Sequence, residues 1–213
     1  MIIFDWDGTL CDSAAHIVAA VQSAARDMGL AVPSDEAAAN IIGLGLAEAM
    51  ARLFPEIPAR RRATLIQAYS THYVANEVDT PDLFPGALDT LHSLRDRGLE
   101  LAVATGKSRR GLDRILAKLD LVGFFHATRC ADETQSKPHP QMIHEIIRER
   151  AVDPGDVVMV GDTEYDLEMA SNAGVASVGV SFGVHSVERL AAHGPVAIID
   201  TLPQLLDLPA LRR

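Results

Sequence analysis

The feature that most limits the fold is an alternation of short apolar runs and helical patterns, which begins near residue 83. Five apolar runs read as short strands, at 99–105, 124–130, 156–162, 175–181 and 196–200. Helical patterns precede the first three strands, at about 86–97, 108–119 and 139–150. Apolar strands that alternate with helices are typical of a parallel sheet covered on both faces. With the apolar run IIF at the start of the chain, this pattern predicts one doubly wound α/β domain of about six strands.

Residues 14–81 have a different pattern, because they contain four helical stretches and no convincing strand. They separate the first predicted strand from the rest of the sheet. The sequence therefore predicts a Rossmann-like α/β core from residues 1–13 and 82–213, interrupted by an all-helical domain over 14–81. Breaks at Pro81 and at Pro85–Gly86 suit a hinge where the chain returns to the sheet.

Composition excludes some classes of protein. The formal net charge of −10 argues against a nucleic-acid partner, which normally requires a basic surface. It does not argue against a small anionic substrate, because a local site can oppose the overall charge. Cys11 and Cys130 are far apart and lack metal-ligand spacing, so we expect small buried residues and a cytoplasmic protein. We see no signal peptide or membrane span, and the sequence does not indicate an oligomeric state.

Polar residues gather where the predicted strands end. Ligands of doubly wound sheets bind outside the carboxyl ends of the strands. Those ends and the loop before residue 139 carry four acids, one hydroxyl, one glycine amide and one ammonium group: Asp5, Asp7, Asp162, Asp166, Thr105, Gly106 and Lys137. Each residue alone has an ordinary structural explanation, such as a turn, a helix cap or a solvated loop. Their joint position predicts one shared site.

Several carboxylates held together repel one another and raise each other's pKa unless a cation lies among them. Oxygen ligands without histidine or cysteine favour a hard ion such as Mg²⁺, which binds carboxylates, water and a substrate phosphate. Lys137 would balance charge on the opposite side of the site.

Four ordered motifs carry a resemblance to a known family: DWDGTL at 5–10, TG at 105–106, KP at 137–138 and GDTEYD at 161–166. Together they resemble the motifs of the haloacid dehalogenase superfamily, and the match spans the whole chain. The helical insertion is similar to that superfamily's cap domain. The stretches DWDGTLCDS, SKPHP, GDTEYD and SVGVSFG look most like the phosphoglycolate-phosphatase-like branch.

The resemblance implies a Mg²⁺-dependent phosphatase of small phosphorylated metabolites. Asp5 resembles the nucleophile that forms an aspartyl-phosphate, and Asp7 resembles the general acid and base. The Asp5 carboxylate, the Asp7 main-chain carbonyl and Asp162 would hold the metal.

The remaining residues of the motifs would support the reacting phosphoryl group. Thr105, the Gly106 amide and Lys137 would bind the phosphoryl oxygens. Asp166 would orient the metal shell or Lys137. The resemblance does not indicate which phosphorylated metabolite is the substrate.

Other chemistries of the superfamily are less compatible with this sequence. Asp7 argues against haloacid dehalogenation, since dehalogenases lack the second acid. Phosphonate cleavage requires a cap lysine, and residues 14–81 contain none. The same lack disfavours a sugar-phosphate mutase without excluding it, and a non-catalytic binding or regulatory protein with this fold is a further alternative.

Three smaller expectations concern residues near the motifs. We expect Trp6 to pack in the core, and Asp12 and Ser13 to cap the first helix of the insertion. The bend at 43–45 fits two interpretations equally, a loop that faces the site and a loop that only packs.

Overall fold

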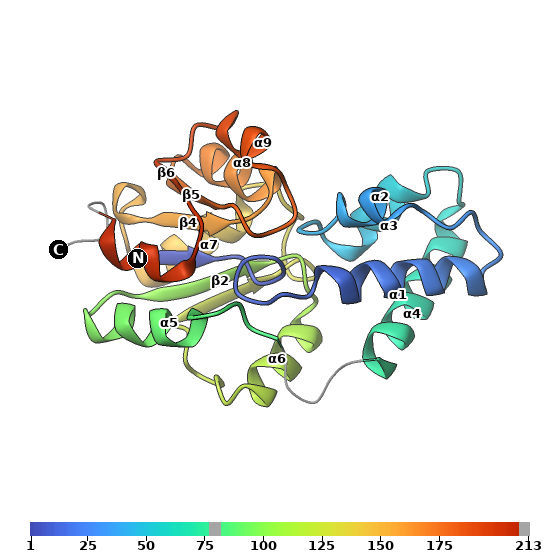
Figure 1. Ribbon diagram of the computed structural model, residues 1–213, viewed down its shortest axis with the longest axis horizontal. Helices are drawn as coiled ribbons and strands as arrows, with labels where there is room; N and C mark the ends of the chain where they lie inside the picture. The colour runs from blue at the N-terminus through green and yellow to red at the C-terminus, as the bar shows by residue number, and fades with distance from the viewer. Residues whose placement is uncertain (77–81, 209–213) are drawn as a thin grey trace.

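The computed structural model describes residues 1–76 and 82–208 of the chain, and a parallel six-stranded sheet forms its centre (Figure 1). The strand order is β3-β2-β1-β4-β5-β6, so the chain builds outward from β1 in both directions, as a doubly wound fold requires. The strands are β1 Ile2–Phe4, β2 Leu101–Thr105, β3 Ala127–Cys130, β4 Val158–Gly161, β5 Ala176–Val180 and β6 Ala197–Ile199. The predicted fold class and all six predicted strands are confirmed.

The central strand β1 explains why the first apolar run can be so short. Ile2 pairs with Leu101 of β2 on one side and with Val158 of β4 on the other. All three residues of β1 are fully buried. A strand with neighbours on both edges and helices on both faces has no side that faces water, so each of its positions is apolar.

Helices cover both faces of the sheet. Ile2 and Phe4 point into one apolar cluster, together with residues of α5 (Ala87–Asp96) and α6 (Arg109–Lys118). Ile3 points into the opposite cluster, with residues of α7 (Gln141–Arg150) and α8 (Glu164–Ala173). The two clusters follow from the alternation of side chains along a strand.

Helix α8 and three shorter elements of the second half were not predicted from the sequence. These shorter elements are α9 (Val187–Ala191) and two 3₁₀ helices, η1 (Pro154–Asp156) and η2 (Leu202–Asp207). The helices predicted at 86–97, 108–119 and 139–150 are confirmed as α5, α6 and α7.

Four helices lie beyond the carboxyl ends of the strands (Figure 1). They are α1 (Ala14–Asp27), α2 (Asp35–Ala39), α3 (Leu46–Leu53) and α4 (Ala59–Ala75). They pack around a separate apolar cluster that includes Val21, Met50 and Leu65. We refer to these helices and their connecting loops as the cap. The exact division at 13/14 and 81/82 stays a proposal, because Pro81 of the predicted hinge lies outside the described residues.

Several smaller features complete the fold. Trp6 is fully buried and packs edge-on against Phe125, as expected. Cys11 and Cys130 are both buried free thiols. In the part of the chain that the structure describes, no helix has the length and apolar character that crossing a membrane requires.

Candidate active site

Asp5 lies where β1 ends. Its main-chain N–H donates to the Val160 carbonyl, 2.9 Å away, so the backbone is still held by β4. The side chain is 1% exposed, and its Oδ1 lies 2.7 Å from Nζ of Lys137. Oδ2 of Asp5 is buried without a hydrogen-bond partner. An unpartnered buried carboxylate oxygen is costly, so this atom indicates a site built for a ligand.

Lys137 and Asp166 form the inner wall of the site. The fully buried Nζ of Lys137 lies 2.7 Å from Oδ1 of Asp166, in addition to its contact with Asp5. The other oxygen of Asp166 accepts hydrogen bonds from Thr163, from Oγ1 at 2.7 Å and from the main-chain N–H at 3.1 Å. A Cβ at Gly161 would lie 2.3 Å from Cβ of Asp166, so only glycine fits there. Asp166 is therefore held firmly against Lys137.

Asp162 follows β4 and is fully buried. Its Oδ1 accepts a hydrogen bond from Oγ1 of Thr9 at 2.8 Å, and its Oδ2 accepts one from the Val184 N–H at 2.9 Å. A Cβ on Gly8, whose φ is +81°, would lie 2.1 Å from Oδ2 of Asp162. Gly8 thus lets the first loop pass directly over this carboxylate.

The three carboxylates form a group that could hold a metal ion. Asp5, Asp162 and Asp166 each offer an oxygen, and these atoms lie within 4.8 Å of one another. Burial raises the pKa of Asp5 well above its usual value, and burial with the neighbouring Asp166 raises the pKa of Asp162 to about 7. Lys137 is the cation that the structure places against this group. A divalent cation fits the remaining negative charge, and the free Oδ2 of Asp5 fits a ligand role.

The Asp7 side chain lies apart from this group. Its Oδ1 lies 2.9 Å from Nζ of Lys107 and accepts a hydrogen bond from Oγ of Ser13 at 2.5 Å. The expected capping role of the Ser13 side chain is wrong: Ser13 precedes α1 but makes no capping hydrogen bond, because its hydroxyl is engaged with Asp7.

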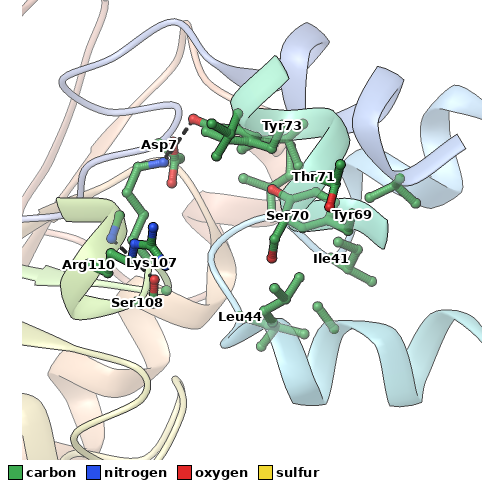
Figure 2. Close-up of a pocket in the computed structure, with 18 of the residues that line it drawn as sticks. Asp7, Ile41, Leu44, Tyr69, Ser70, Thr71, Tyr73, Lys107, Ser108 and Arg110 are labelled. Atoms are coloured by element: carbon green, nitrogen blue, oxygen red, sulfur yellow. Dashed lines mark hydrogen bonds and ion pairs between the residues drawn. The ribbon is translucent and has the colours of Figure 1, made fainter. Parts of the chain in front are cut away.

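Lys107 connects Asp7 to the cap. Its Nζ donates to the hydroxyl of Tyr73, on α4, at 3.1 Å and lies 4.9 Å from the centre of that ring. Figure 2 shows Asp7, Lys107 and Tyr73 together at one end of a pocket. Lys107 and Tyr73 were not predicted as site residues. Only the place of Lys107 directly after Thr105 and Gly106 could have pointed to it.

Thr105 and Gly106 follow β2, as predicted. Thr105 is fully buried, and its hydroxyl oxygen accepts a hydrogen bond from the Lys107 N–H at 3.2 Å. A Cβ at Gly106 would lie 2.5 Å from the carbonyl oxygen of Leu44 in the cap. The bend at 43–45 therefore packs against the core beside the site, and Gly45 also donates to Oγ of Ser136 at 2.7 Å.

A cavity of about 600 Å³ lies between the cap and the core, next to Asp7. Lys107, Ser108 and Arg110 line it from the core, and Leu44, Tyr69 and Ser70 are among the residues that line it from the cap (Figure 2). The site thus has a buried carboxylate end and a larger compartment beneath the cap.

A family model described as haloacid dehalogenase-like hydrolase matches residues 2–180. The chain belongs to the haloacid dehalogenase-like hydrolases. The predicted family and the prediction of a hydrolytic enzyme are confirmed. This hydrolase is similar over nearly its whole length to proteins that carry phosphatase names.

A protein from Dickeya dadantii (strain 3937) named "Probable phosphatase IndB" is 33% identical, over 97% of this chain and 91% of its own length. A protein from Agrobacterium fabrum (strain C58 / ATCC 33970) named "Phosphoglycolate phosphatase" is also 33% identical, over 94% of this hydrolase and 88% of its own length. A crystal structure from Haemophilus somnus 129pt, titled as a predicted phosphoglycolate phosphatase, has a TM-score of 0.87 at 25% identity and covers 97% of this chain and 96% of its own.

Proposed function

We propose that this hydrolase is a Mg²⁺-dependent phosphatase that cleaves small phosphomonoesters through an aspartyl-phosphate, as in the phosphoglycolate-phosphatase-like branch. One observation carries the proposal: both oxygens of the Asp5 carboxylate are buried without a hydrogen-bond partner among the described residues, and Oδ1 lies 2.7 Å from Nζ of Lys137. A carboxylate that a cation positions and that keeps a free oxygen is suited to attack an electrophile. The names of the two relatives support the same reaction.

Asp5 would attack the phosphorus atom, forming an Asp–O–P bond as the bond to the substrate's alkoxide breaks. Asp7 would give its proton to that alkoxide. In the second step Asp7, now ionised, would take a proton from water, whose oxygen attacks the same phosphorus. Inorganic phosphate would leave, and the Asp5 carboxylate would be restored.

Other residues would hold the phosphoryl group during both steps. Thr105, the Gly106 N–H and Lys137 would bind its oxygens, since phosphoryl transfer depends mainly on positioning and charge. Asp166 would keep the Lys137 ammonium in place through their 2.7 Å contact.

Mg²⁺ would be held by the Asp5 carboxylate, the Asp7 main-chain carbonyl and Asp162. When bound, it supplies positive charge at the transferred phosphoryl group. Asp166 is less suited to direct ligation, because its Oδ1 contacts the Lys137 ammonium and its Oδ2 accepts two hydrogen bonds from Thr163. Each oxygen of Asp162 accepts only one hydrogen bond among those of the described residues.

Two alternatives are less well supported. The superfamily's sugar-phosphate mutases rely on a cap lysine, and residues 14–81 contain no lysine. A non-catalytic binding or regulatory protein is less well supported because the matching family model describes hydrolases and the two relatives carry phosphatase names.

Phosphate release from a panel of small phosphomonoesters, with and without Mg²⁺, tests the proposal. Asp5→Asn is expected to lower the rate by at least about a thousandfold, because the amide cannot act as the nucleophile. Asp12→Asn, at an exposed acid of the same loop, is the matched control and should retain full activity. Equal release by the native protein and Asp5→Asn would refute the nucleophile assignment. A rise in glucose 6-phosphate from a glucose 1-phosphate substrate, without phosphate release, would favour the mutase.

A further inference from the structure

The cavity beside Asp7 is much larger than a two-carbon leaving group requires. Its volume is about 600 Å³, and cavities of about 300–1,000 Å³ enclose ligands of drug size. The relatives named phosphoglycolate phosphatase raise the question of whether glycolate fits this compartment. The following inference rests on the proposed function, since it concerns the leaving group of the same reaction.

Within the described ranges, the cap side of the cavity offers a carboxylate no charged partner. Among the described residues, the cap contributes no charged side chain to the cavity wall. Asp7 at 2.9 Å and the hydroxyl of Tyr73 at 3.1 Å already engage the ammonium group of Lys107. Arg110 and Arg114 also line the cavity from the core; Arg110 is exposed to solvent and Arg114 is partly exposed, and ion pairs in such positions add little binding free energy.

The cap side of the cavity is largely apolar. Ile41, Ile42 and Leu44 form part of this wall and are each at most 5% exposed in the protein. Tyr69 and Tyr73 add two aromatic rings, with centroids 5.8 Å apart, from neighbouring turns of α4. Burying a carboxylate against such a wall is costly, whereas burying a ring is favourable.

We propose that the preferred substrate of this phosphatase is a phosphomonoester with a neutral, ring-containing leaving group, which the cavity between Tyr69 and Lys107 encloses. The phosphoryl group would lie at Asp5 and Lys137. The ring would lie beyond Asp7, against Leu44 and the two tyrosines. The hydroxyl of Ser70 and the amide of Gln67 also line the cavity and can form hydrogen bonds with hydroxyl groups on such a ring.

Steady-state kinetics with four alkyl phosphates test this inference: ethyl phosphate, phosphoglycolate, 2-phenylethyl phosphate and 2-(4-carboxyphenyl)ethyl phosphate. All four release alkoxides, so the comparison measures enclosure of the leaving group rather than a change to a phenoxide. We expect kcat/KM for 2-phenylethyl phosphate to exceed that for ethyl phosphate and phosphoglycolate by at least about tenfold. The added carboxylate should remove most of that gain.

A cavity-filling variant locates the effect. Ser70→Phe is expected to lower the ratio of kcat/KM for 2-phenylethyl phosphate to that for ethyl phosphate by about tenfold. Thr64→Phe is the matched control, since Thr64 is exposed on the same helix and does not line the cavity. That variant should leave the ratio unchanged. Circular dichroism and the Tm of both variants show whether they are folded.

The possible outcomes separate the two proposals. If the protein cleaves phosphoglycolate fastest, or if Ser70→Phe does not change the ratio, the inference is overturned while the phosphatase proposal stands. p-Nitrophenyl phosphate serves as a reactive reference ester. If Mg²⁺-dependent release is absent even from that ester, the proposed function fails, and the inference fails with it.

Discussion

Nζ of Lys107 lies 2.9 Å from Oδ1 of Asp7 and 3.1 Å from the hydroxyl of Tyr73. One ammonium group therefore contacts both the proposed general acid of the core and a side chain of the cap. Lys107 and Asp7 have side-chain exposures of only 10% each, so solvent screens their interaction less than at an open surface. The position of the cap and the orientation of Asp7 are thus physically connected.

Replacing Lys107 with methionine keeps the length of the side chain and removes its charge. We expect kcat to fall by about tenfold to a hundredfold, because Asp7 loses the group that orients it. Lys118→Met, at an exposed lysine near the end of α6, is the control and should retain native kinetics. Unchanged kcat in Lys107→Met would show that the contact with Asp7 has no role in the reaction.

Tyr73→Phe removes the hydroxyl group that Lys107 contacts and keeps the aromatic ring. A single hydrogen bond contributes about 0.5–1.5 kcal/mol, so we expect a change of only a few-fold to about tenfold in kcat/KM. The effect should be smaller than that of Lys107→Met, because the ammonium would still reach Asp7. A larger effect would mean that the hydroxyl acts on the substrate directly.

Magnesium should stabilise the protein, because it offsets repulsion among the buried acids. At a hundred times its Kd, a bound ligand adds about 2.7 kcal/mol to the free energy of unfolding. For a chain of this size, that corresponds to a rise in Tm of about 5–10 °C. Thermal unfolding with MgCl₂ or EDTA measures the effect without any substrate.

Asp162→Asn tests where the ion binds. The amide can still accept the hydrogen bond from Thr9, so the variant should fold, and its Tm should no longer respond to Mg²⁺. Asp12→Asn should respond like the native protein. A full response in Asp162→Asn would place the ion elsewhere.

Gly106→Ala should disturb the packing of the cap loop at 43–45 against the core. The new Cβ would lie 2.5 Å from the carbonyl oxygen of Leu44 and 2.7 Å from that of Gly43, so the loop has to move. We expect a Tm several degrees lower and a higher KM. Gly155→Ala in η1 is the control, since its added Cβ meets no atom within 4 Å. A native KM in Gly106→Ala would show that the loop does not affect the site.

The ion pair between Arg109 and Glu133 makes the free energy of unfolding depend on pH. Arg109 donates hydrogen bonds to the carboxylate of Glu133, the shortest of them 2.8 Å long. These bonds lower the pKa of Glu133 in the folded protein. The unfolded chain therefore takes up a proton first as the pH falls. The stabilising effect is present above the ordinary glutamate pKa of about 4.3 and is lost as the pH falls through the lowered value.

Glu133→Gln makes this dependence measurable. At neutral pH the native protein should have the higher Tm, and the difference should shrink steadily in acid. Because the pair is partly exposed, the difference at neutral pH should be small. If the difference in Tm persists at the lowest pH, it arises from packing rather than from charge.

The strands β1, β2 and β4 could be predicted because they are buried at every position, which leaves a continuous apolar run in the sequence. The ends of those runs also predicted that Asp5, Thr105 and Asp162 lie at one edge of the sheet. The short helix α9 has only five residues and gives little periodic signal. Lys107 could not be predicted as a site residue, since its role depends on Tyr73, 34 positions away on a different structural unit.

The sequence by itself determined the class of sheet, the helical insertion and the order of the acids, because local periodicity and strand ends depend on neighbouring residues alone. Only the tertiary structure decided three further points: that the buried oxygens of Asp5 lack a hydrogen-bond partner among the described residues, that Ser13 contacts Asp7 instead of capping α1, and that the cap encloses an apolar cavity. The first two depend on how loops of the core come together, and the third depends on how the cap packs over the core. Such packing is set by the shapes of two separate apolar surfaces, which no local pattern in the sequence records.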